Sequence, residues 1–116
     1  MTDERQVRQI LAQYQRHGWN LRRVLLSPAT MAKLSFADLF GQATVIAADF
    51  DAAWFSRGAA DGGEAWELRT LSAAPFALIE VFEDTDEEVV REEIRHEMET
   101  QMQERASKPV GRKPTD

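Results

Sequence analysis

The chain contains no cysteine, which excludes disulfide bonds, thiolate catalysis and cysteine-bound zinc. Its only histidines, His17 and His96, lie in different segments, which argues against a metal site built from nitrogen ligands. No apolar run approaches the roughly 20 residues that a transmembrane helix needs. The start of the chain also lacks the basic and apolar stretches of a secretion signal. These absences predict a cytoplasmic protein without a membrane segment.

The composition is that of an ordinary globular domain, with 116 residues of which 43% are apolar and 29% charged. We expect one domain over residues 1–106 and a flexible basic tail over residues 107–116, where two prolines interrupt any periodicity. The net charge of −6 is unevenly spread. Residues 1–23 carry five arginines and two acids, whereas residues 83–105 carry ten acids and three arginines. The two ends could therefore attract each other, or the acidic segment could meet a basic partner.

Helical periodicity marks both ends of the domain. Over residues 3–17 it involves Val7, Ile10, Leu11 and Tyr14, with Thr2 as the expected cap and Gly18 as the stop. Over residues 85–106 it recurs every four residues at Val90, Ile94, Met98 and Met102. Thr85 and Glu88 have the spacing of a capping box at the start of this second helix. Its narrow apolar stripe predicts a helix that lies across a sheet or pairs with its copy in a dimer.

Four strands are predicted between these helices, over residues 21–26, 44–57, 64–71 and 76–82. Two short helical turns, beginning at Ser27-Pro28 and at Ser35, separate the first two strands. Their apolar side chains are expected to close one end of the core; they are Met31, Leu34, Phe36, Leu39 and Phe40. The fourth strand is apolar on both sides apart from Glu80, so we expect it in the centre of the sheet.

The strands over residues 44–57 and 64–71 alternate between apolar and charged positions on either side of a glycine-rich turn. We expect Trp54 to lie opposite Trp66 and Asp51 opposite Arg69, because a slip by one residue would place Trp66 among charges. The fold class is then α+β, with a mostly antiparallel four-stranded sheet, an N-terminal helix and a long C-terminal helix. Both helices are expected on the apolar face, which would gather Ile46, Phe50, Trp54, Trp66 and Leu68 against Val7, Ile10, Leu11 and Tyr14.

The opposite, charged face of the sheet is the one place where chemistry is conceivable. Its carboxylates would be Asp49, Asp51, Glu67 and Glu80, provided that Glu67 lies opposite Glu80. Such a cluster suits Mg²⁺ or Mn²⁺, and Arg57 and Arg69 could then hold a phosphate, as in a metal-dependent phosphoesterase or nuclease. A ladder of cross-strand ion pairs explains the same pattern more simply.

No motif names a reaction, and no catalytic residue or cofactor is predicted. Ser56 lacks a nucleophile setting, while His17 suits a helix C-terminus and His96 a helix surface. We therefore favour a non-enzymatic protein-interaction module, with a homodimer as one form of it. The residues expected to contact a protein partner of unknown identity are Phe55, Arg57, Arg69, Glu92 and Glu93. The arginines of the first helix and the basic tail suggest weak nucleic-acid binding, but the overall acidity argues against it.

Overall fold

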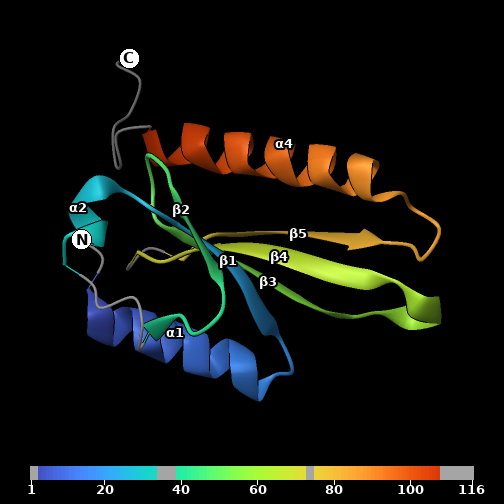
Figure 1. Cartoon of the computed structure of the whole chain (residues 1–116), viewed down its shortest axis with the longest axis horizontal. Helices are drawn as coiled ribbons and strands as arrows, with labels where there is room; N and C mark the ends of the chain where they lie inside the picture. The colour runs from blue at the N-terminus through green and yellow to red at the C-terminus, as the bar shows by residue number, and fades with distance from the viewer. Residues whose placement is uncertain (1–2, 34–38, 73–74, 108–116) are drawn as a thin grey trace, which may run out of the picture.

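The protein is described here by a computed structural model that covers residues 3–33, 39–72 and 75–107. A five-stranded sheet lies between two helices, α1 (Glu4–Arg16) and α4 (Glu88–Ser107), which cover opposite faces (Figure 1). The predicted α+β class and both long helices are confirmed. The sheet has five strands instead of four, and the prediction that both helices share one face was wrong, because both faces of the sheet carry large apolar side chains. Of the predicted tail, residues 108–116 lie outside the described residues.

The N-terminal helix forms as its periodicity predicts, with Val7 and Ile10 buried. Its cap is Asp3, whose carboxylate accepts a hydrogen bond from the Gln6 amide at 2.8 Å; the expected cap, Thr2, lies outside the described residues. Gly18 adopts φ +84°, a left-handed conformation that ends the helix without steric cost. None of the helices in the described part of the chain combines the length and apolar character of a membrane span.

The sheet order is β2-β1-β3-β4-β5, and only β1 and β2 are parallel. The strands are β1 (Asn20–Leu26), β2 (Thr44–Ala47), β3 (Ala52–Gly58), β4 (Glu64–Thr70) and β5 (Ala77–Phe82). The short helix α2 (Pro28–Met31) follows β1 and begins at the predicted Ser27 cap. Leu39 and Phe40 are buried and Met31 packs against the same core, as expected. The start of the second predicted turn at Ser35, together with Leu34 and Phe36, falls outside the described residues.

The single strand predicted over residues 44–57 is in fact two strands, β2 and β3, on either side of β1. The chain crosses the end of β1 between them, where the Ala48 amide donates to the Leu26 carbonyl oxygen at 2.9 Å. The Asp51 carboxylate accepts hydrogen bonds from the Ser27 amide at 2.8 Å and from the Thr30 hydroxyl at 2.6 Å. These bonds fix the crossing. The alternation of apolar and charged residues in the sequence continues through it, so the pattern does not mark the break between the two strands.

The pairing of β3 with β4 differs from the predicted register by two residues. Trp54 lies opposite Leu68 and Ser56 opposite Trp66, because the chain reverses through a five-residue loop, Ala59–Gly63. That loop contains the 3-10 turn η1 (Ala60–Gly62). A shift of two residues keeps every side chain on its face. The two indole rings therefore still share one face, with their centroids 5.9 Å apart.

The core has two parts, one on each face of the sheet. Beneath α1 lie Val24, Leu26, Ala53, Phe55 and Leu71 with Val7 and Ile10. Beneath α4 lie Leu25, Trp54, Trp66, Leu68 and Phe82 with Met98 and Met102. The predicted packing of Trp54 and Trp66 against the N-terminal helix was therefore wrong, because these two side chains face α4. The predicted stripe of α4 does lie across a sheet, although Val90, at its start, remains 42% exposed.

The predicted capping box at the start of α4 was also wrong. The helix begins at Glu88, so Thr85 stands in the preceding turn. Within that turn, the Asp86 carboxylate accepts a hydrogen bond from the Glu83 amide at 2.8 Å. The turn is thus stabilised by Asp86, and the Glu87 carbonyl oxygen accepts the first helical hydrogen bonds, from Val90 and Arg91.

Candidate functional site

The four carboxylates proposed as metal ligands are divided among three places. Asp49 and Asp51 both lie in the connection between β2 and β3. Asp49 accepts a hydrogen bond from the Gln103 side chain of α4 at 3.0 Å. Asp51 is bound to the Ser27 amide and the Thr30 hydroxyl. Both carboxylates therefore serve contacts that hold the crossing of the chain in place.

Glu67 and Glu80 lie on opposite faces of the sheet. The prediction that they oppose each other was wrong by one residue, since Glu67 is opposite Ile79 and Glu80 is opposite Trp66. Among residues 3–33, 39–72 and 75–107, no group of three or more acidic or histidine side chains is placed to hold a metal ion. The cluster on which a metal-dependent hydrolase would depend is therefore not formed by the described residues.

Two of the residues predicted to contact a partner are engaged in the packing of α1. Phe55 is 1% exposed and stacks on the Tyr14 ring, with centroids 4.0 Å apart. Arg57 donates a hydrogen bond to the His17 carbonyl oxygen at 3.0 Å, and its guanidinium lies 4.4 Å from the centre of the Trp19 ring. The interaction role predicted for Phe55 is thus incompatible with its burial.

Of the other three predicted contact residues, one lies on β4 and two lie on α4. Arg69 is half-buried and donates a hydrogen bond to the Thr70 carbonyl oxygen. On α4, Glu93 is exposed, whereas Glu92 forms ion pairs with arginines from β1 and α4. Of the five predicted contact residues, only Glu93 is an exposed charge for which no contact is described.

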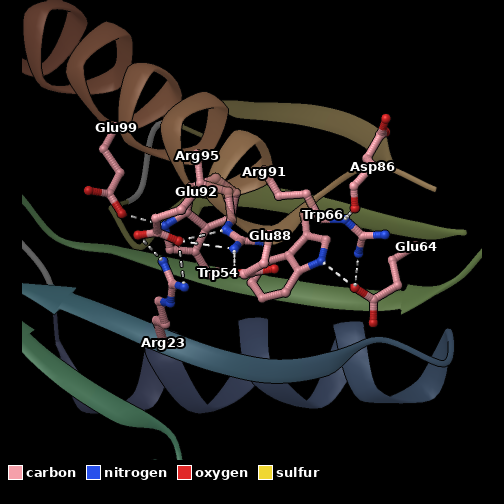
Figure 2. Close-up of polar contacts among 10 residues, drawn as sticks. All are labelled: Arg23, Trp54, Glu64, Trp66, Asp86, Glu88, Arg91, Glu92, Arg95 and Glu99. Carbon is pink, nitrogen blue, oxygen red and sulfur yellow. Dashed lines mark hydrogen bonds and ion pairs between the residues drawn. The ribbon is translucent and has the colours of Figure 1, made fainter. Parts of the chain in front are cut away.

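A polar cluster that the sequence did not reveal lies between α4 and the sheet (Figure 2). At its centre Arg95, 1% exposed, donates hydrogen bonds to Glu92 at 3.1 Å and to Glu88. Its guanidinium also lies 4.3 Å from the centre of the Trp66 ring and 5.7 Å from that of Phe82. The signal that could have revealed it is spacing, because position 95 continues the inward face defined by residues 98 and 102.

Arg23 of β1 joins this cluster from below, with its guanidinium 2.9 Å from the Glu92 carboxylate (Figure 2). The pairing of β1 with β3 skips Arg22 between Leu21 and Arg23, which marks a β-bulge. Partial burial by itself would raise the pKa of Glu92, but the hydrogen bonds from Arg23 and Arg95 outweigh it and lower that pKa. Glu92 thus remains ionised and ties the long helix to β1, an interior strand of the sheet.

A second set of polar contacts, centred on Arg91, acts as a clamp on the turn that leads from β5 into α4. The Arg91 guanidinium donates to the Glu83 carbonyl oxygen at 2.7 Å, to the Asp86 carbonyl oxygen at 3.1 Å and to the Glu64 carboxylate at 3.1 Å. The same carboxylate accepts a hydrogen bond from the Trp66 indole at 3.1 Å. Among the described buried side-chain polar atoms, none lacks a partner. The clamp therefore serves to position α4 on the sheet.

On the opposite face, Tyr14 donates a hydrogen bond from its hydroxyl to the Glu67 carboxylate. Burial, followed by this bond, raises the pKa of Tyr14 above its ordinary value of 10.0. The fold thus favours the neutral phenol. This contribution to stability is complete below pH 10 and is lost as the pH rises through the higher pKa of the folded state.

We expect an alkaline titration of the folded protein to show little tyrosinate at pH 10, where a free phenol is half ionised. Ultraviolet absorbance of tyrosinate is a direct readout because Tyr14 is the sole tyrosine of the chain. Glu67→Gln should lower the pKa of Tyr14 relative to the parent protein, while burial keeps it above 10. Half ionisation at pH 10, with circular dichroism still native, would contradict this assignment.

Among the large apolar side chains of the described sheet, the two most exposed lie on β5. Ile79 is 56% exposed and Val81 is 58% exposed. They point to the α1 face, since they lie opposite Glu67 and Ala65 of β4. The helix α1 reaches β3 and β4 through Tyr14, which contacts Phe55 and Glu67, but the exposure of Ile79 and Val81 shows that these two side chains are not covered. In the described sheet β5 is the last strand, so its outer backbone groups have no neighbouring strand. We define this open edge, formed by β5 and the side chains of Ile79 and Val81, as the β5 edge.

The comparisons with known proteins assign no family to this fold. No family model matches the chain, and neither a curated protein nor a solved structure resembles it at a significant level.

Proposed function

We propose that the protein is a non-enzymatic protein-interaction module that binds a polypeptide along the β5 edge. The observation that carries the proposal is the exposure of two β-branched side chains, Ile79 and Val81, on a strand whose outer side has no described neighbour. An added strand gains affinity from backbone hydrogen bonds and specificity from alternate side chains. Exposed apolar residues on an open edge are the features that such binding uses.

The engagement of the polar side chains supports the same proposal. Asp51, Glu67 and Arg95, which are the chemically most suggestive groups, are each bound to a structural partner inside the fold. The contacts of α1 and α4 with the sheet hold it in place, and the β5 edge is part of that sheet. This is the arrangement expected of a scaffold that offers one edge strand for recognition.

The proposal is tested by comparing the proteins retained by the immobilised parent chain, an Ile79→Lys variant and an Ile46→Lys control. Ile46 lies on β2 at the other edge of the sheet and is 37% exposed, so the control adds the same charge to another edge strand. We expect a polypeptide that is retained by the parent and by Ile46→Lys but not by Ile79→Lys. Retention of the same proteins by all three would overturn the assignment of the β5 edge.

A further inference from the structure

The strand β5 has the composition of an interior strand but lies at an edge. Its six residues are apolar apart from Glu80, and they include no lysine, proline or glycine. Soluble proteins usually protect an edge with charged side chains, lysine above all, with proline, with a bulge or with a covering segment, because an open edge invites another strand. Of these residue types β5 has only the single charge of Glu80. A neighbour on its outer side would give β5 the surroundings that its sequence suits.

The backbone of β5 shows which of its residues would meet that neighbour. The Thr70 amide donates to the Phe76 carbonyl oxygen at 2.9 Å, so these two opposed residues form a hydrogen-bonded pair. Such pairs alternate along an antiparallel ladder. Leu78, Glu80 and Phe82 therefore bond to β4, whereas Ala77, Ile79 and Val81 direct their amides and carbonyl groups outward.

We propose that the partner strand is β5 of a second copy of this chain, paired antiparallel about a twofold axis at Ile79; this inference rests on the proposed function. A twofold axis perpendicular to the sheet places outward-directed residues opposite one another. Two central registers satisfy the backbone: one sets Ile79 opposite Ile79, and the other sets Glu80 opposite Glu80. Opposed like charges are destabilising, so the Ile79 register is favoured.

This register is also complementary in its side chains. On the α1 face, Ala77 meets Val81 of the second copy on both sides of the central Ile79 pair. The apolar side chains that are exposed in one chain thus form a continuous patch across two. On the α4 face, Glu80 meets Leu78 of the second copy, so its aliphatic stem lies along an apolar neighbour. The net charge of −6 opposes association, so the dimer should tighten as salt is added.

The test measures the association of the full chain by analytical ultracentrifugation over a range of concentrations and salt. We expect a dimer for the parent and for Ile46→Lys. Ile79→Lys and Ile79→Glu should each weaken dimerisation about tenfold or more, because each sets like charges at the axis. An equimolar mixture of the two should recover a heterodimer, since lysine then opposes glutamate. A monomeric parent, or a dimer unaffected by either substitution, overturns the proposal.

Amide hydrogen exchange supplies a readout at single residues. Protection of Ala77, Ile79 and Val81 should increase with protein concentration, whereas protection of Leu78 and Glu80, whose amides bond to β4, should not change. Protection of the outward amides at all concentrations would mean that the edge is covered within one chain, and it would overturn the proposal. A monomeric parent that still retains another polypeptide in an Ile79-dependent way would overturn only the choice of a second copy. If the parent neither dimerises nor retains another polypeptide in an Ile79-dependent way, the proposed function fails as well.

Discussion

Gly63→Ala should destabilise the protein by about 3 kcal/mol, the upper end of the usual range for overpacking a well-packed site. A Cβ atom at this position would lie 2.4 Å from the Phe82 carbonyl oxygen and 3.3 Å from that of Ala60. The first contact is with backbone at the end of β5, where Phe82 is paired with Glu64 and is 1% exposed. Neither strand can move away without disturbing this pairing and the core beneath α4.

The matched control is Gly58→Ala, at the end of β3 on the other side of the same loop. An added Cβ there meets nothing within 4 Å, and no left-handed backbone conformation requires glycine. This variant should lie within about 1 kcal/mol of the parent, and its lower unfolded-state entropy favours a gain. Chemical denaturation followed by tryptophan fluorescence measures both. Equal stability of the two variants would show that the loop accommodates a side chain at position 63.

The elements formed by local periodicity were predicted correctly. Both long helices depend on spacings that neighbouring residues define, so they follow from the sequence. The strand over residues 21–26 follows from its short length and its end at Ser27-Pro28. The start of α4 did not, because Asp86 stabilises the turn ahead of it in place of a Thr85 cap. A capping-box pattern shows how a helix could be capped at that position, but it does not show that the helix begins there.

The sheet order depends on contacts that the sequence pattern does not contain. The alternation over residues 44–57 continues through the crossing between β2 and β3, so periodicity could not show that one strand was two. The strand β5 was predicted in the centre of the sheet because it is apolar on both sides, but it lies at the edge. The strand β5 is nevertheless apolar on both sides apart from Glu80, and the proposed pairing with a second copy offers a physical reason for this composition.

The predicted carboxylate cluster failed because it rested on register. In β3 and β4 the error was two residues, which left each side chain on its face and kept Trp54 beside Trp66. Between β4 and β5 the error was one residue, which moved Glu80 to the face opposite Glu67. A site assembled from several strands is therefore lost by a shift too small to alter the predicted elements.

Replacing Arg95 separates the contributions of packing and charge to the attachment of α4. Arg95→Ala should cost about 3 kcal/mol, because it empties a fully buried position between the Trp66 and Phe82 rings. Glu88 and Glu92 are largely exposed and can turn to water, so no buried carboxylate is left without a partner. The cost therefore comes mainly from the lost packing and the lost contacts with the two rings.

Arg95→Met is the matched variant, since methionine fills much of the same volume without charge. Removing one partner of a buried ion pair is costly only where the other charge stays buried, and Glu88 and Glu92 can both turn to water. We therefore expect a change below about 1 kcal/mol at pH 7. The dependence of the unfolding free energy on pH in the acid range should nevertheless change. Arg95 helps to lower the pKa of Glu92, a contribution to stability that is present above the ordinary value of 4.5 and lost as the pH falls. In Arg95→Met that dependence should become shallower, while Arg95→Lys, which keeps the charge, should retain more of it. If methionine proves as damaging as alanine at pH 7, the ion pairs and not the packing hold the helix to the sheet.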